Sequence, residues 1–161
     1  IGMPGELGMN QKDLSDDIWS VFANGTSVQG LYINPNRMNT GAWDCLASAI
    51  KWARENEKIM ADVHWVGGNP AQGEVYGYAA WSPQKATLML RNPSQDVKTF
   101  EVDVAKVFEL PENTGKDFLL FDVKNNNTTN KYNTSNLKGR LFKIELKPFE
   151  VKVFDALPKI D

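Results

Sequence analysis

The stretch GLYINPNRMNTGAWDCLASAIKWARENEKIM, residues 30–60, combines a short apolar run, a polar break and an amphipathic helix. The run VQGLYIN (28–34) is almost uninterrupted, as expected of a β-strand covered on both faces. Asn34, Pro35 and Asn36 end it, and Asn39 or Thr40 can cap the helix that follows. The apolar residues of this helix recur at helical spacing: Trp43, Leu46, Ala47, Ile50 and Ala53. Because one strand and one helix cannot cover their own apolar faces, the stretch indicates part of a larger layered fold.

A second helix is predicted before this strand. Ser15 can cap it, Asp16 and Asp17 would lie in its first turn, and Gly25 suits a left-handed stop. Residues 15–60 therefore predict helix, strand and helix, which is α/β organisation.

The pattern changes after about residue 74. Short runs rich in β-branched and aromatic residues alternate with turn signals, which favours an antiparallel β-sandwich. The runs are EVYGYAAW, ATLMLRN, VKTFEVD, DFLLFDV, RLFKIEL and FEVKVFDAL. DVAKVFELPE predicts a brief helix or an irregular crossover, and KNNNTTNKYNTSN (124–136) a polar loop. We expect a mainly β chain with two parts: an incomplete α/β segment at 1–61 and a complete β-sandwich at 62–161.

Composition excludes several classes of function. The chain has 161 residues, 42% of them hydrophobic and 24% charged, with a net charge of −2, so it lacks the basic surface of nucleic-acid or anionic-membrane binders. Cys45 is the single cysteine, which excludes an internal disulfide and a Cys-based zinc site. No apolar run reaches the roughly 18 residues of a transmembrane helix. The abrupt opening IGMPGELGMN leads us to expect an excised piece whose parent's location this sequence cannot give.

No residue cluster predicts catalysis, a metal or a cofactor. His64 is the sole histidine and lacks a Ser or Cys partner, so packing and hydrogen bonding at an interdomain seam is the favoured role. The glycines near residues 67–73 do not have phosphate-loop spacing. Among the acids, Asp62 and Glu74 flank the boundary, and no convincing carboxylate pair stands out.

Aromatic residues concentrate just after the boundary. Trp65, Tyr76, Tyr78 and Trp81 form the densest group, and Tyr76 and Tyr78 share a strand face. Such rings can stack on sugars from an exposed face, but more often they fill a core or a domain seam. Both roles stay open for His64 and these four residues.

Several segments in this order resemble a known family: LYINP, KWARENEKIM, ADVHWVGGNPAQGEVYGYAAW, LRNPS and LKPFEVKVFDAL. Together they are similar to the C-terminal end of large bacterial candidate glycoside hydrolases related to the α-galactosidase type, some of which carry the label enterotoxin. The resemblance covers nearly the whole chain.

This resemblance implies a (β/α)8 barrel followed by a C-terminal β-sandwich. Residues 15–60 would be the last helix, strand and helix of the barrel, and Asn34, Asn36 and Arg37 would lie on its substrate rim. The catalytic carboxylates would come from earlier strands, so we expect this piece to be inactive by itself. Its partners would be the missing barrel portion of the same chain and, through the parent enzyme, a carbohydrate. A secreted or periplasmic location would suit such a parent.

Two other functions remain open on the sequence. An independent carbohydrate-binding module would use the aromatic residues, and an Ig-like interaction domain would show a contiguous apolar patch on the sandwich. We also expect residues 15–60 to fold back onto the sandwich or to pair with another copy, because their barrel-facing surface needs cover.

Overall fold

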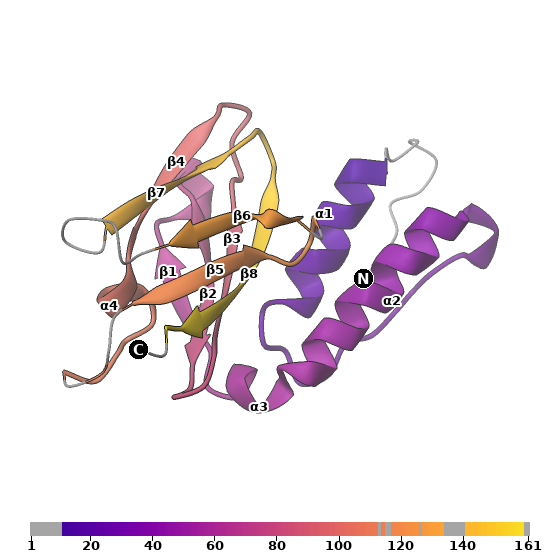
Figure 1. Cartoon of the computed structure of the whole chain (residues 1–161). Helices are drawn as coiled ribbons and strands as arrows, with labels where there is room; N and C mark the ends of the chain where they lie inside the picture. The colour runs from indigo at the N-terminus through magenta and orange to yellow at the C-terminus, as the bar shows by residue number, and fades with distance from the viewer. Residues whose placement is uncertain (1–10, 113, 115–116, 126, 134–140, 160–161) are drawn as a thin grey trace.

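The chain folds into a helical layer packed against a two-sheet β unit (Figure 1). The structure is a computed structural model that describes residues 11–112, 114, 117–125, 127–133 and 141–159, with 127–133 described by their backbone. The helical layer holds α1 (Gln11–Phe22), α2 (Thr40–Glu55) and α3 (Glu57–Met60). None of the described helices is both long enough and apolar enough to cross a membrane.

Eight strands follow the helices, and all pair antiparallel. Six form one sheet in the order β1-β2-β3-β8-β5-β6, and β4 and β7 form a second, two-stranded sheet. Their bounds are β1 His64–Gly67, β2 Tyr76–Trp81, β3 Ala86–Arg91, β4 Lys98–Asp103, β5 Phe118–Asp122, β6 Asn127–Asn133, β7 Leu141–Leu146 and β8 Val151–Pro158. The fold is thus mainly antiparallel β structure preceded by helices, as predicted.

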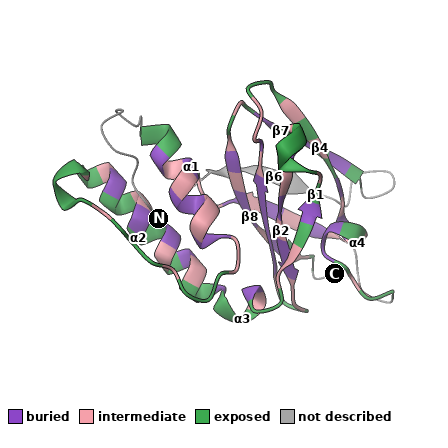
Figure 2. Ribbon diagram, turned by 180° about the vertical axis from the view of Figure 1, so that it is seen from behind, coloured by how far each residue is buried: buried purple, intermediate pink, exposed green. Residues whose placement is uncertain are grey.

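The main core lies between the two sheets. In β7, Phe142, Ile144 and Leu146 point inward and alternate with exposed residues. Strand β3 is buried along Ala86–Leu90 because one face meets the small sheet and the other meets the helices. The neighbouring strands likewise turn one face to the small sheet and the other to the helices. The molecule therefore has three layers, with the large sheet between the helices and the small sheet (Figure 2).

Local signals in the sequence explain several element ends. Asn39 caps α2 by accepting a 2.8 Å hydrogen bond from the Ala42 amide. Gly25 has φ +78, and a Cβ there would lie 2.4 Å from Val63 Cγ1. The predicted brief helix is α4 (Val104–Val107), capped by Asp103. All three observations confirm the predictions.

Four predictions about secondary structure were wrong. Helix α1 already includes Gln11, so Ser15 does not cap it, and Asp16 and Asp17 lie in its middle. Residues 28–34, predicted as a buried strand, belong to neither sheet, and only Tyr32 among them is in an isolated β-bridge. The boundary segment contributes edge strand β1, and the polar stretch after residue 124 contributes edge strand β6. Edge strands tolerate polar sequences because only one side of the backbone needs a partner.

The apolar stripe of α2 is also rotated from the predicted one. The residues that face α1 and the sheet are Ala42, Leu46, Ala49 and Trp52. Trp43 and Ala47, placed in the stripe by their spacing, are exposed. Helix α2 therefore has two apolar sides, and only one is fully covered in this chain.

Asn92 joins two loops at one end of the sandwich. Its side-chain Nδ2 lies 2.8 Å from the Asp96 carbonyl and 2.9 Å from that of Lys147, and its backbone N–H donates to Glu150 at 2.9 Å. The residue is 0% exposed. A buried amide with this many partners fixes the LRNPS and LKPFE segments against each other.

We predict that Asn92→Ala lowers the free energy of unfolding by about 2–3 kcal/mol, because buried carbonyls lose their donor. Urea denaturation followed by circular dichroism measures this. Asn69→Ala is the control, since Asn69 is exposed and its side chain accepts a single loop hydrogen bond, from the Ala71 amide; its cost should be about 1 kcal/mol or less. Equal costs would contradict the proposed role of Asn92.

Candidate functional site

The extended segment before α2 exposes apolar side chains. Val28 is 84% exposed and Tyr32 81% exposed, and Leu31 is also largely open. No charged residue occurs between Val21 and Asn36. The segment has the sequence of a covered strand, but none of the described strands pairs with residues 27–31, because the large sheet already ends at β1 and β6.

The three predicted rim residues lie together directly after this segment. They belong to or flank the 3₁₀ turn Pro35–Arg37 and are all exposed. Asn34 caps that turn by accepting a 3.1 Å hydrogen bond from the Asn36 amide. The side chains of Asn36 and Arg37 have no hydrogen-bond partner among the described residues. Turn formation thus explains Asn34, whereas a sugar contact by the three residues stays a prediction.

His64 connects β1 to the turn after α4. Its Nε2 lies 2.8 Å from the Val107 carbonyl, and its Nδ1 lies 3.8 Å from Glu109 Oε2. The ring therefore makes its hydrogen bond within the sandwich. Within the described ranges, no group of His, Cys, Asp and Glu side chains could hold a metal ion.

The predicted aromatic group separates into two places. Trp65 stacks on Tyr76 with ring centroids 4.9 Å apart and meets Tyr78 edge to face at 5.4 Å. Trp81 is on the opposite face of β2, packed against the core between the sheets. Residues 76, 78 and 81 of one strand cannot share a face because strand side chains alternate.

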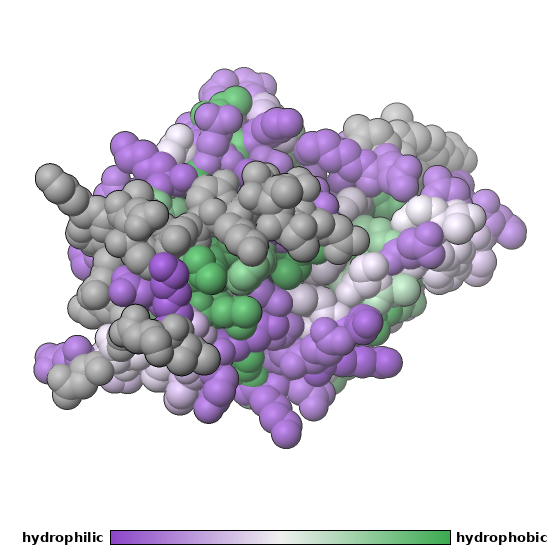
Figure 3. Space-filling view, in the orientation of Figure 1, coloured by the Kyte–Doolittle hydropathy of each residue, from purple (hydrophilic) through white to green (hydrophobic). Residues whose placement is uncertain are grey.

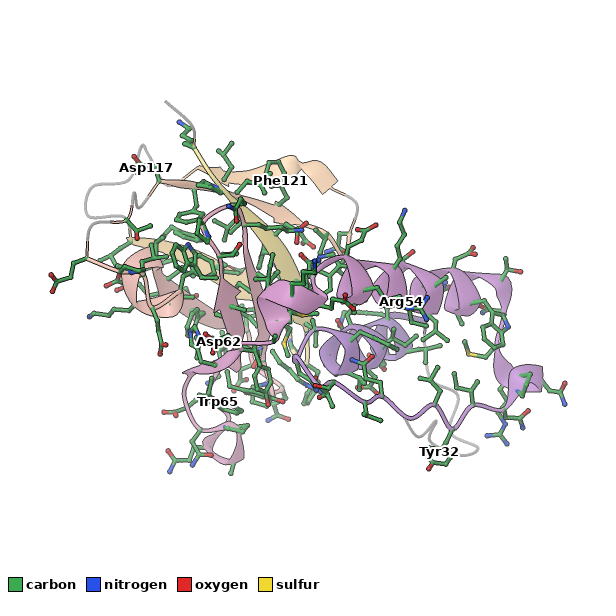
Figure 4. All side chains as sticks on the ribbon, turned by 90° about the horizontal axis from the view of Figure 1, so that it is seen from below. Tyr32, Arg54, Asp62, Trp65, Asp117 and Phe121 are labelled. Carbon is green, nitrogen blue, oxygen red and sulfur yellow. The ribbon has the colours of Figure 1, made fainter. Side chains whose placement is uncertain are left out.

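The two boundary acids, Asp62 and Glu74, lie in different environments. Glu74 Oε2 accepts a 2.6 Å hydrogen bond from the Asn69 amide and so organises the β1–β2 connection. A Cβ on Gly68 would lie 2.3 Å from that same oxygen, which explains the glycine. Asp62 is exposed and lies between Trp65 and the helices in Figure 4.

The sequence analysis missed the polar centre of the helix–sheet seam. Asp16 Oδ1 on α1 accepts hydrogen bonds from Lys124 Nζ and, at 3.0 Å, from the Val151 amide of β8. Lys124 Nζ also donates to the Val151 carbonyl at 3.0 Å. The Asp16 and Lys124 side chains are 5% and 7% exposed, so this is a buried ion pair.

Lys12 adds a second cation to this centre. Its Nζ lies 2.9 Å from Asp16 Oδ2. Desolvation lowers the pKa of Lys12, but its hydrogen bond and charge attraction to Asp16 outweigh that effect and raise the pKa above its usual value.

Further contacts fix the rest of the helical layer. Trp52 Nε1 on α2 donates to Asp155 of β8 at 2.9 Å, and Lys85 lies 2.7 Å from the other carboxylate oxygen. The Trp52 ring meets Trp19 of α1 edge to face, with centroids 5.8 Å apart. Met89, Val151 and Val153 complete the apolar floor beneath them. The seam is thus as well packed as a domain core.

A hollow of about 460 Å³ opens on the other side of this layer. It lies between the end of α1, the extended segment and α2, and its lining includes Phe22, Leu31, Ile50, Arg54 and Met60. The seam faces the sheet, whereas the hollow and the extended segment face away from it.

These features define a class: an antiparallel β-sandwich whose large sheet carries a docked helical layer with an open apolar side. Solved structures of the same fold are known. A candidate α-N-acetylgalactosaminidase from Bacillus halodurans C-125 superposes with a TM-score of 0.68 at 15% identity, over 94% of this chain and 33% of its own. α-Galactosidase I from Mortierella vinacea gives 0.68 at 9% identity, over 96% and 37%. A candidate α-galactosidase from Bacteroides fragilis NCTC 9343 gives 0.60 at 13% identity, over 96% and 30%.

At these identities the likeness shows the fold alone. The chain spans about a third of the length of each of these proteins. Neither a protein-family model nor a curated protein matches the sequence.

We predict that Asp16→Ala lowers the free energy of unfolding by about 3–5 kcal/mol, because it leaves the Lys124 ammonium buried without a counter-charge. Chemical denaturation measures the effect. Adding Lys124→Met to this variant should recover part of the loss by removing the stranded charge.

The neighbouring Asp17→Ala is the matched control. Asp17 lies 3.5 Å from Arg91, and both side chains are partly exposed, so its cost should be about 1 kcal/mol or less. The buried-centre interpretation is wrong if the two alanine variants are equally stable.

Proposed function

We propose that this chain is the non-catalytic C-terminal part of a carbohydrate-active enzyme of the α-galactosidase type, in which the β-sandwich supports a catalytic (β/α)8 barrel. Residues 15–60 would be the end of that barrel: α1, the strand formed by 28–34, and α2. The division at residue 61 separates barrel from sandwich in this proposal.

The observation that carries the proposal is a strand sequence without a sheet. Residues 28–33 lie between two helices and expose Val28 and Tyr32 to solvent, although the same helices are tightly docked on the other side. A parallel barrel strand needs a neighbour on each side and apolar cover on both faces. Upstream barrel strands would supply both.

The comparisons support this arrangement in two ways. The likeness covers at least 94% of this chain, so it includes helices as well as sandwich. It covers only about a third of each larger protein, which leaves room for a barrel. Bacterial origin and the enterotoxin label remain predictions from the resemblance alone.

The proposal gives the seam a function. Asp16, Lys124 and Trp52 hold the last barrel helices against β8, which would keep the closing strand in register. The turn at Asn34, Asn36 and Arg37 follows the carboxyl end of that strand, where barrel enzymes bind substrate. The glycosidic acids would be contributed by upstream strands.

An Ig-like interaction domain explains the structure less well. The exposed large apolar residues on the sandwich come from three different strands and two loops: Trp65, Leu141 and Leu157 from the strands, and Val97 and Phe149 from the loops. Figure 3 shows that hydrophilic residues make up most of the described surface on this side, and that the hydrophobic residues in its middle form a small group. The most exposed apolar side chains, Val28 and Tyr32, belong to the helical layer instead.

The coding region upstream of residue 1 tests the proposal directly. We expect it to encode about twice the length of this chain, since the chain is about a third of its structural relatives. That region should alternate strands and helices and carry Asp or Glu at two strand ends. An upstream region without this pattern would overturn the proposal.

We predict that the 161-residue chain hydrolyses no aryl α- or β-glycoside above the buffer rate. The physical reason is that general acid and nucleophile or base must face each other across the bond. Turnover that disappears on changing one of its own acids, Glu74→Gln for example, would contradict this expectation.

Hydrogen exchange rates should differ between the extended segment and the two long helices of the helical layer. We predict faster amide exchange at 27–29, which lie in none of the described helices and strands, and strong protection in α1 and α2. Mass spectrometry after pulse labelling measures both. Fast exchange throughout 11–60 would mean that the docked helices fray and that the seam does not hold them.

A further inference from the structure

One exposed tryptophan belongs to the sandwich and not to the helical layer. Trp65 lies on edge strand β1, on the outer face of the large sheet, and is 46% exposed. Helices α1 and α3 cover the strands further along this face, and their apolar cluster ends at Tyr78. Figure 4 shows Trp65 on the sandwich, well separated from Tyr32 in the helical layer.

Two tyrosines hold the indole in place. The Tyr76 ring is nearly parallel to it, at an interplanar angle of 9°, and the Tyr78 ring is nearly perpendicular, at 82°. The Tyr76 ring therefore covers one indole face, and Tyr78 adds a second contact, while Trp65 remains 46% exposed. A flat apolar surface fixed in this way loses little entropy on binding a ligand.

Polar groups border this surface. The Trp65 indole N–H and the Tyr76 and Tyr78 hydroxyls make no hydrogen bond with any other described residue. All three side chains are partly exposed, so water can hydrogen-bond to these groups in the free protein. A ligand with several hydroxyls could replace that water without leaving a donor unpaired.

The surroundings of Trp65 differ from those of a protein interface. In the helical layer four large apolar residues are exposed, namely Val28, Leu31, Tyr32 and Trp43, and that number suits a large apolar partner. In contrast, no other large apolar residue of β1, β2 or their connection, residues 64–81, is exposed. The β1–β2 connection is rich in glycine and polar residues, namely Gly67, Gly68, Asn69, Gln72, Gly73 and Glu74.

We propose that Trp65, with Tyr76 and Tyr78, is a binding platform for a pyranose sugar. The C–H groups on one face of the ring would lie on the open, electron-rich face of the indole, and the ring hydroxyls would bond the phenol and indole groups. A galactoside is the first probe because several of its C–H groups lie on one face; that choice rests on the proposed function. The platform itself does not.

The test is a titration of the full chain with methyl α-galactoside, methyl α-glucoside and sorbitol. The five indole N–H signals in ¹H–¹⁵N spectra report on each tryptophan separately, and the signal missing from Trp65→Ala assigns Trp65. We expect a saturable shift of that signal in the millimolar range with a glycoside. Sorbitol offers hydroxyls without a ring face and should give none.

Matched variants locate the site. Trp65→Ala should weaken binding by about tenfold or more, and Trp43→Ala by less than about twofold, although Trp43 is similarly exposed at 43%. If Trp65→Ala fails to fold, as judged by its other indole signals, Trp65→Phe should still weaken binding severalfold.

Three results would overturn the platform: no saturable shift with either glycoside, an equal response to sorbitol, or equal loss in both alanine variants. Each of these is distinguishable from failure of the proposed function, because the upstream coding region tests that function without reference to Trp65.

Discussion

The buried carboxylate of Asp16 is the contact on which the arrangement of the layers depends. Strand β8 pairs with β5 from Pro158 to Phe154, opposite Asp122, where β5 ends, and the Val123 amide donates one further hydrogen bond to the Val153 carbonyl. The amide of Val151 lies beyond that point, and Asp16 of α1 is its acceptor. Lys124, at the turn after β5, supplies the counter-charge and also bonds the Val151 carbonyl. The Asp16 carboxylate thus accepts a hydrogen bond from a strand amide, neutralises a buried cation and holds α1 against β8.

This centre also explains why the helices face as they do. With Asp16 fixed on β8, the same side of α1 places Ile18, Trp19 and Phe22 over the sheet. Trp52 then packs on Trp19 and reaches Asp155, which sets the rotation of α2. That rotation turns Trp43 and Ala47 outward. The exposed side of the helical layer is therefore a direct consequence of how tightly its other side is docked.

Local signals in the sequence were sufficient for much of the fold. Six strands, α4, the cap at Asn39 and the stop at Gly25 were predicted because each depends on residues close in sequence. The rest depends on distant contacts. Asp16 and Lys124 are 108 positions apart, so spacing alone placed Asp16 in a solvated first turn. The strand at 28–34 was predicted from its apolar residues, but a strand also needs partners, and it belongs to neither of the described sheets.

The candidate site shows the same limit. Strand alternation alone separates Trp81 from Tyr76 and Tyr78, so that split was available from the sequence. The meeting of Trp65 with both tyrosines required the β1–β2 register, which pairs Trp65 with Tyr78. The hydrogen bond of His64 required the position of α4, because its partner Val107 lies 43 residues away and within the sandwich.

The covering of both faces of the large sheet restricts where this chain can bind another molecule. One face of the sheet is covered by β4 and β7, and the middle of the other is covered by α1 and α3. A broad ligand surface on the sheet, as an independent binding module would use, is therefore already occupied by the chain's own elements. What remains open on the sandwich is its edges and loops, and among the residues whose side chains the structure describes, Trp65 of β1 is the one large exposed aromatic residue on an edge strand. Support of the helices and binding at an edge are compatible because they use different strands of one rigid sheet.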